Sequence, residues 1–367
     1  SIPFTDGKYI GALLDRNGLR PSRYTVTKDG YVVMSSEAGV LDIEPANVEK
    51  HGRLMPGRMF LVNMDEGRII EDEEIKTKVV SERPYQEWID KHLLKLSEVP
   101  YTGNHVTVES EDYDTRLRIF GYTQEDFKTL ILPMSIQGKE AIGSMGTDTP
   151  LAVLSDRPQL LYNYFKQLFA QVTNPPLDGI REEIVTDTSL SLGSEINLFD
   201  VSEDHAKKLS IQNPVISNED LDKIKYIDHV DYKSVSISSL YPLEKGVNGL
   251  ENALENIITE IEKAIETGVN IVILSDRGVA ANMAPIPMLL ACAHTHNSFK
   301  RLKKRSKFEI VIESAEPREP HHFSCLFGYG ASAINPYMVN EIIADQVQVK
   351  NIKGIDADVA IQNFNKA

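Results

Sequence analysis

Cysteine and basic residues are scarce in this sequence, and their scarcity excludes several classes of protein. The 367 residues include two cysteines, Cys292 and Cys325, both among apolar neighbours. This pattern excludes a disulfide framework and indicates reduced core residues of a cytoplasmic protein. Lys and Arg number 39 against 54 Asp and Glu, which gives a net charge of −15. Because a nucleic-acid-binding face needs the opposite balance, nucleic acid is not an expected partner.

Long hydrophobic runs are missing as well. No stretch reaches membrane-spanning length without charges, and the opening residues SIPFTDGKYIGALLD lack the basic and apolar regions of a signal peptide. We therefore expect no membrane partner. A strand-like pattern begins almost at residue 1, so we expect the chain to be an internal piece of a longer polypeptide. At this length, two or more domains are expected.

The stretch over residues 142–183 is dense in packing features and poor in reactive ones. Its sequence predicts a Gly/Thr-rich turn over 143–149, a short strand over 151–154 and an aromatic-rich helix from Pro158 to about residue 173. Apolar side chains from Leu160 to Val172 recur at three- and four-residue spacing and share one face of that helix. No nucleophile stands out, so we interpret this stretch as an organiser of other parts of the molecule.

The first 96 residues change from a strand pattern to a helix pattern. Short apolar segments over 9–15, 23–27, 31–35 and 58–64 are separated by Gly-containing turns, which predicts antiparallel β structure. Residues 71–96 have helical spacing that is interrupted at Pro84, and a polar stretch follows over 97–114. Thr123 and Asp126 then form a capping-box pattern at the start of a helix predicted over 123–132.

Strands and helices alternate in the last part of the chain. Strands are predicted over 235–240, 270–274, 308–312 and 331–335, and helices over 178–190, 247–267, 285–301, 322–329 and 336–347. This order is typical of βα units with a mainly parallel sheet, so the expected fold class is α/β. Four such units are half of an eight-unit barrel, and the strand over 151–154 would add a fifth.

Long motifs resemble two known families. The runs LLDRNGLRPSRY (13–24), MSSEAGVLD (34–42) and LMPGRMFLVNMDEG (54–67) resemble the C-terminal part of a class II glutamine amidotransferase domain. In that family the first residue is a catalytic cysteine, whereas Ser1 stands first here, so we assign no glutaminase residue. The runs RLRIFGYTQED (116–126), IVILSDRGV (271–279) and PREPHHFSCLFGYGASAINPY (317–337), together with residues 140–183, look like the central domain of glutamate synthases.

The resemblance implies a domain order and a function. A β-rich amidotransferase remnant (1–80) and a helical linker (81–114) would precede a central domain (115–367) that resembles a rudimentary TIM barrel. The complete enzyme would make glutamate from glutamine and 2-oxoglutarate, with electrons carried by FMN and an iron–sulfur cluster. We expect no catalytic residue, cofactor or metal in this segment, and no activity from it alone.

The same resemblance implies partners and a route for ammonia. The partners would be the flavin-binding synthase barrel and the rest of the amidotransferase domain, both in the same polypeptide. Exposed strand edges in the truncated first domain predict self-association. In the family, ammonia travels inside the protein along a path that the central domain helps to line. Ser144, Thr147 and Thr149 offer hydroxyl groups to such a passenger. The alternative is a polar turn that only starts a strand.

An alternative function is a stand-alone barrel-like enzyme. Asp276 and Glu313 follow predicted strands and could act as an acid/base pair. In the competing interpretation, Ser275 and Asp276 cap the next helix and Arg277 pairs with a carboxylate.

Three further patterns have structural explanations that we favour. The possible metal ligands have no established zinc spacing, so packed histidines are expected; these residues are Cys292, His294, His296, His321, His322 and Cys325. The run Gly328 to Ala333 lacks the third glycine of a dinucleotide-binding turn and is interpreted as a helix-to-strand turn. The basic cluster from Lys300 to Lys307 is interpreted as a solvated helix end.

Overall fold

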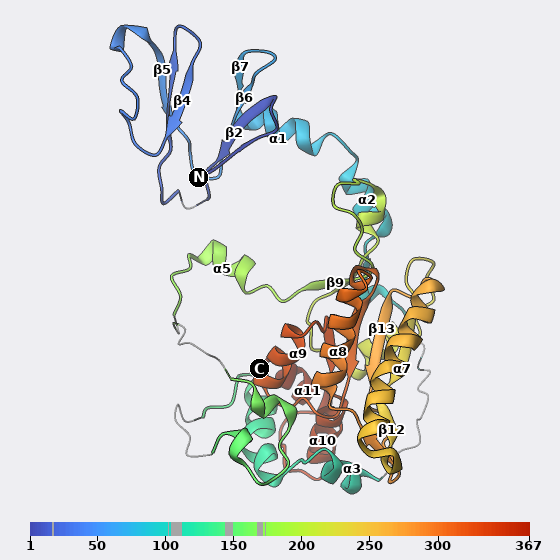
Figure 1. The fold of residues 1–367 in the computed structure, drawn as a ribbon. Helices are drawn as coiled ribbons and strands as arrows, with labels where there is room; N and C mark the ends of the chain where they lie inside the picture. Colours follow the sequence, from blue (N-terminus) through green and yellow to red (C-terminus); the bar gives the residue numbers. More distant parts are fainter. Residues whose placement is uncertain (17, 102, 104–111, 144–149, 167–171, 173) are drawn as a thin grey trace. The chain divides into compact units, whose positions relative to one another are not determined.

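The computed structural model describes the chain except for residues 17, 102, 104–111, 144–149, 167–171 and 173 (Figure 1). The described residues divide into two compact units, Ser1–Glu87 and Trp88–Ala367. Helices and several sheets contribute to the fold, which confirms the α/β class. Among the described residues, every helix is too short or too polar to cross a bilayer.

The first unit contains two small antiparallel sheets. One has the order β1-β2-β6-β7 and consists of β1 (Ile2–Thr5), β2 (Tyr9–Leu13), β6 (Met59–Asn63) and β7 (Arg68–Ile70). The other has the order β4-β3-β5 and consists of β4 (Val32–Ser35), β3 (Arg23–Thr27) and β5 (Val48–Arg53), with the turn η1 (Pro45–Asn47) before β5. The prediction of antiparallel structure is therefore confirmed. A small core of Ala12, Leu14, Leu54 and Phe60 holds the unit together.

Two short helices follow the first sheet. α1 (Asp72–Val80) and α2 (Tyr85–His92) are separated at Pro84, as the sequence predicts. Asp72 at the start of α1 accepts a hydrogen bond from the backbone N–H of Met59 at 2.9 Å and pairs with Arg58, which fastens the helix to β6.

The second unit is built on a four-stranded parallel sheet. Its order is β11-β13-β15-β16, with β11 (Ser234–Ser238), β13 (Ile271–Ser275), β15 (Glu309–Glu313) and β16 (Ala333–Asn335). The crossover helices are α7 (Gly246–Glu266), α8 (Met288–Arg301) and α9 (Pro320–Gly328), and β16 is followed by α10 (Tyr337–Gln348) and α11 (Ala357–Lys366). The predicted alternation is confirmed, and α11 is an additional helix that was not predicted from the sequence.

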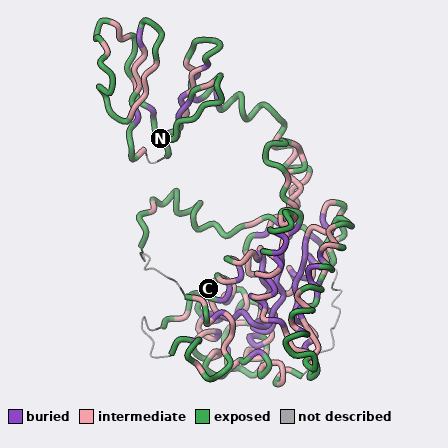
Figure 2. Tube along the Cα trace, viewed as in Figure 1, coloured by how far each residue is buried: buried purple, intermediate pink, exposed green. Residues whose placement is uncertain are grey.

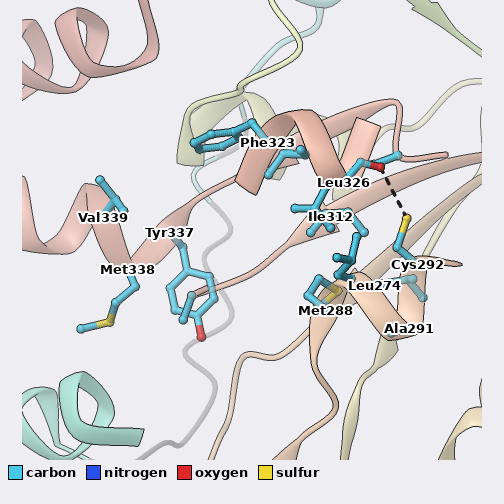
Figure 3. Close-up of a cluster of buried hydrophobic side chains, with 14 of the residues drawn as sticks. Leu274, Met288, Ala291, Cys292, Ile312, Phe323, Leu326, Tyr337, Met338 and Val339 are labelled. Carbon is cyan, nitrogen blue, oxygen red and sulfur yellow. Dashed lines mark hydrogen bonds between the residues drawn. The ribbon is translucent and has the colours of Figure 1, made fainter. Parts of the chain in front are cut away.

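Both faces of this sheet are covered. Along β13, Ile271 and Ile273 pack into one core with Leu221 and Ile224 of α6 (Asn218–Lys225). The alternate side chains Val272 and Leu274 pack into the other core, with the helices on that side. Figure 3 shows part of that second core, in which the Cys292 Sγ lies 3.9 Å from the Leu326 carbonyl oxygen. Burial on both faces explains why β13 and β15 are continuous apolar runs.

Smaller elements surround this layer. Two further sheets have the orders β8-β10-β9, made of β8 (Leu94–Lys95), β10 (Leu209–Ile211) and β9 (Leu190–Leu192), and β12-β14, made of β12 (Leu240–Pro242) and β14 (Met283–Pro285). Single 3-10 turns lie at η2 (Leu96–Glu98), η6 (Glu203–Ala206), η7 (Leu243–Lys245) and η8 (Arg305–Lys307). The chain before residue 140 adds α3 (Tyr113–Ile119), a π-helical stretch (Asp126–Ile131) and α4 (Leu132–Gln137).

The capping box predicted before the π-helical stretch is confirmed. The Thr123 N–H donates to Asp126 Oδ2 at 2.8 Å, and the Asp126 N–H donates back to Thr123 Oγ1 at 3.1 Å. These reciprocal bonds satisfy two N–H groups that the first helical turn leaves free.

The prediction for residues 151–173 is wrong in its described part. Residues 152–154 form a 3-10 turn, η4 (Ala152–Leu154), instead of a fifth strand. In the described part of the predicted aromatic helix, the helical residues are those of η5 (Leu161–Tyr164), after which Phe165 is extended. Tyr162 is fully buried and stacks on the His322 ring at 4.4 Å. Tertiary burial of Tyr162 therefore accounts for part of the apolar spacing that suggests a helix.

The helix predicted over 178–190 is also shorter than expected. α5 spans Gly179–Val185, because residues 190–192 pair with β10 as β9. Among the described residues, the parallel sheet is open, with β11 and β16 at its edges. A closed barrel is therefore not observed in this part of the chain.

Candidate functional site

Polar residues end three neighbouring strands of the parallel sheet. Ser275 pairs in register with Glu313, and Glu313 pairs with Asn335. All three are buried, and Glu313 is only 1% exposed. The carboxyl edge of a parallel sheet is where α/β proteins usually hold their ligands, so this edge is the first place to look for chemistry.

Glu313 is held as a buried carboxylate by two cations. Lys225 Nζ and Ser275 Oγ each donate to Glu313 Oε2 at 2.7 Å, and Arg277 Nε donates to Oε1. Burial by itself would raise the pKa of Glu313, but the charges of Lys225 and Arg277 outweigh it and lower the pKa below its ordinary value. Glu313 is therefore ionised and has no proton to donate near neutral pH.

Arg277 extends this ion pair into a chain of charges. Its guanidinium lies 4.0 Å from the centre of the Tyr337 ring, and its Nη1 donates to Glu341 Oε1 at 3.3 Å. The other Glu341 oxygen accepts a 2.6 Å hydrogen bond from Arg116 Nη1. The structure thus confirms the interpretation that Arg277 pairs with a carboxylate. The chain of charges ties α3 and α10 to the sheet.

Asp276 has a different environment from Glu313. It is fully buried, and it accepts hydrogen bonds from Ser314 Oγ at 2.6 Å and from the Ala315 N–H at 3.0 Å. The Tyr337 hydroxyl is a further hydrogen-bond partner, and burial raises the pKa of Asp276 to about 7. The prediction that Asp276 caps the next helix is wrong, because α8 begins only at Met288.

A second buried acid, Glu316, lies in the loop after β15. Glu316 Oε2 accepts hydrogen bonds from the Met288 N–H at 3.0 Å and from the Tyr162 hydroxyl at 3.2 Å. Burial and the nearby charge of Asp276 raise the pKa of Glu316 to about 7. Asp276 and Glu316 are therefore two buried acids near the carboxyl edge of the sheet. Ionising both of them together is costly.

The proposed acid/base pair is not assembled as an accessible site. The Asp276 N–H donates to the Glu313 carbonyl oxygen at 3.2 Å, but the two carboxyl groups have separate hydrogen-bond partners. Asp276 is 0% and Glu313 1% exposed, so no substrate reaches either carboxyl group. The geometry supports a structural role for both residues.

Arg318 fastens the segment that contains α3 to this same edge. It is 2% exposed, and its guanidinium donates to the Phe120 and Gly121 carbonyl oxygens at 2.6 and 3.1 Å. It also pairs with Asp126 at 3.2 Å and stacks on the Tyr122 ring at 3.7 Å. The sequence patterns do not predict this role, because nothing local distinguishes a buried arginine from a surface one.

The suggested metal ligands are distributed among separate contacts. His294 faces Glu255, the ring of His296 accepts a hydrogen bond from Arg305, and His322 pairs with Glu319 at 3.0 Å. His321 contacts the Tyr162 carbonyl oxygen, and Cys325 lies 3.7 Å from the His321 ring. Across the described ranges, no group of three or more metal-binding side chains is assembled. Both cysteines are free, and burial raises the pKa of Cys292 to about 12.

The two remaining patterns are structural. Residues 329–332 connect α9 to β16, which confirms the helix-to-strand turn. The end of α8 carries the basic cluster, in which Lys304 pairs with Glu262 at 2.9 Å. Arg305 is not merely solvated, because it donates to the Gly330 carbonyl oxygen at 2.9 Å and to the Phe308 carbonyl oxygen.

Comparison with known proteins decides the family. The family described as "Glutamate synthase central domain" matches residues 115–367, and "Glutamine amidotransferases class-II" matches residues 1–88. The chain belongs to the glutamate synthase family. It is 46% identical to the glutamate synthase (NADPH) large chain of Bacillus subtilis, over 100% of this chain and 24% of that relative.

Two further members of the family are similar over nearly the whole chain. Glutamate synthase (NADH) of Schizosaccharomyces pombe is 39% identical over 99% of this chain and 18% of the relative. Ferredoxin-dependent glutamate synthase 2 of Synechocystis is 38% identical over 100% of this chain and 24% of the relative. The chain thus spans about a quarter or less of the length of these glutamate synthases.

The two cysteines and the residues at the carboxyl edge of the sheet do not fit an iron–sulfur cluster or FMN, the redox groups implied for a glutamate synthase. An iron–sulfur cluster usually takes about four cysteine ligands, and the chain has two. The phosphate of FMN favours free donors and positive charge, whereas the cations at the sheet edge, Lys225 and Arg277, are already paired with Glu313. The residues suggested for the ammonia path, Ser144, Thr147 and Thr149, lie outside the described residues.

Proposed function

We propose that this chain is the connecting scaffold of a glutamate synthase, placed between its glutaminase and flavin domains. The observation that carries the proposal is the carboxyl edge of the parallel sheet. Where enzymes of this architecture keep open sites, Glu313, Arg277 and Asp276 fill the edge with buried ion pairs and hydrogen bonds. The chain spans only 24% of the Bacillus subtilis and Synechocystis relatives, which supports a role as one part of a larger enzyme. In this proposal the segment alone is inactive.

The scaffold has three parts in this proposal. They are the end of a class II amidotransferase domain (1–80), a helical linker (81–114) and a central domain (115–367) related to a rudimentary TIM barrel. The parallel order of β11, β13, β15 and β16 with intervening helices supports the barrel relation. The compactness of residues 1–87 supports a separate first domain.

The complete enzyme would convert glutamine and 2-oxoglutarate into two molecules of glutamate in the cytoplasm, as part of nitrogen assimilation. FMN and an iron–sulfur cluster would be held by other parts of the polypeptide. The first domain would pack against the rest of the amidotransferase, and the central domain against the flavin-binding barrel. Strand β1 is exposed along its whole length, which supports self-association when those partners are missing.

We further propose that Ser144, Thr147 and Thr149 help to line the ammonia path. Thr147→Leu and Thr149→Leu in the full-length enzyme should block the ammonia path without removing glutaminase activity. Glutamine hydrolysis should continue, free ammonia should appear, and glutamate formed from 2-oxoglutarate should fall. Thr259→Leu, on the exposed side of α7, is the matched control. Tight coupling in both variants would show that these residues do not line the path.

A further inference from the structure

Helix α5 exposes an apolar face. All residues of α5 (Gly179–Val185) are exposed, and Figure 2 shows this segment in green. Ile180 is 66% exposed and Ile184 is 72% exposed. Residues four positions apart lie on the same side of a helix. A helix in a folded protein normally buries an apolar side of this kind.

α5 is also too short to be stable without a partner. It has 7 residues, and isolated helices below about 12 residues are marginal in water. Its beginning is nevertheless well defined. Asp178 Oδ1 accepts hydrogen bonds from the Ile180 and Arg181 N–H groups at 3.2 and 3.0 Å. Pro175 and Pro176 stiffen the chain that leads to the helix. The sequence therefore specifies where this short, exposed helix begins.

The charges around α5 indicate the chemistry of that partner. Residues 178–187 contain four acids and one base, which are Asp178, Glu182, Glu183, Asp187 and Arg181. A complementary surface has an apolar floor for the two isoleucines and a basic rim for the carboxylates. The same stretch of chain exposes more apolar surface at η4, where Val153 and Leu154 are 73% and 72% exposed.

The length of the relatives indicates where this surface lies. Residues 1–367 correspond to 24% of the Bacillus subtilis large chain, so most of such a polypeptide is outside them. A groove in the same polypeptide is presented to α5 at an effective concentration on the order of millimolar. A second copy of the chain has no such advantage.

We propose that α5 docks through Ile180 and Ile184 into an apolar, basic-rimmed groove on the part of the same polypeptide outside residues 1–367. The inference rests on the proposed function only in that such a remainder exists. It does not require residues 144–149 to line an ammonia path.

Limited trypsin digestion tests this docking at Arg181, in the middle of α5. Trypsin cleaves only when the helix unfolds locally, so a docked helix is protected. We expect cleavage after Arg181 to be at least roughly tenfold slower in the full-length protein than in residues 1–367, which corresponds to about 1.4 kcal/mol. The Ile184→Ser and Ile180→Ser variants of the full-length protein should lose most of this protection. Because Ser and Ile have similar helix propensities, these substitutions remove the apolar contact and leave the intrinsic stability of the helix nearly unchanged.

Val247→Ser is the matched control, because Val247 is 72% exposed on α7, outside this segment. It should leave the protection of Arg181 intact. Equal cleavage rates in the full-length protein and in residues 1–367 would overturn the proposal. Protection that is already present in residues 1–367 would also overturn it. If that protection rises with concentration, a second copy covers α5, and if it does not, another part of residues 1–367 does. Ammonia coupling is not read out by this assay, so the two proposals fail separately.

Discussion

Replacing Asp276 by Asn should change how the stability of this chain depends on pH. Asp276 is fully buried, and its pKa is about 7 in the folded state against an ordinary value of 3.8. The folded state then holds a proton that the unfolded state loses, so stability from this group is complete below pH 3.8 and is lost as the pH rises through about 7. At 1.36 kcal/mol for each pKa unit, the loss is on the order of 4 kcal/mol. Asn keeps the shape of the neutral acid and cannot ionise.

The assay is urea denaturation followed by far-UV circular dichroism at pH 5, 6, 7 and 8. At pH 5 the Asp276→Asn variant should be about as stable as the parent chain or slightly less stable, because the Ala315 N–H and the Ser314 hydroxyl must find the single amide oxygen. At pH 8 it should be more stable by about 2–3 kcal/mol, because about 2 pKa units of the loss fall between pH 5 and the folded pKa. Glu260→Gln, at an exposed position of α7, is the control and should follow the parent. A difference between the variant and the parent that stays constant from pH 5 to pH 8 would refute the reasoning.

Three further substitutions and one control, Gly354→Ala, test the packing of the second unit by urea denaturation. Arg318→Met should lower the free energy of unfolding by about 3–5 kcal/mol, because it leaves two carbonyl groups without a donor and the Asp126 carboxylate without its cation; a loss below about 1 kcal/mol would contradict that role. Gly330→Ala should cost about 2–4 kcal/mol, since Gly330 has φ +105° and a Cβ there would meet the His296 ring. Gly354→Ala, with φ +83° and open space, should cost only about 1–2 kcal/mol from backbone strain, and equal losses would exclude the clash. Glu313→Gln should cost about 3–5 kcal/mol near pH 7, because it leaves two cations unbalanced, and an unchanged stability would show that the ion pairs are dispensable.

Local sequence patterns predicted secondary structure correctly where neighbouring residues determine it. Alternating apolar residues and Gly turns predicted the antiparallel strands of the first unit, and the Thr123 and Asp126 pair predicted a helix start. The apolar runs of β13 and β15 were predicted because both faces of the sheet are buried. The long motifs also carried the resemblance that comparison with known proteins confirmed.

Two of the predictions failed for different reasons: long-range burial in one case and a short apolar signal in the other. The aromatic spacing after Pro158 suggested a helix, but Tyr162 is drawn into the core against His322, and a single 3-10 turn is enough to place it. α11 was missed although Asp356 caps it and Ala360 and Phe364 lie four residues apart, because the apolar signal is only a few residues long.

The sequence by itself determined the family, the α/β class and the alternation of strands and helices around the parallel sheet, because these depend on composition, periodicity and motifs that can be observed along the chain. Only the tertiary structure decided the character of the sheet edge. Asp276 and Glu313 have the same carboxyl chemistry, yet one has a raised pKa and the other a lowered one. The difference arises because Lys225, which is 88 positions from Glu313 in sequence, reaches the latter and not the former. Contacts of that separation are set by packing and leave no local trace in the sequence.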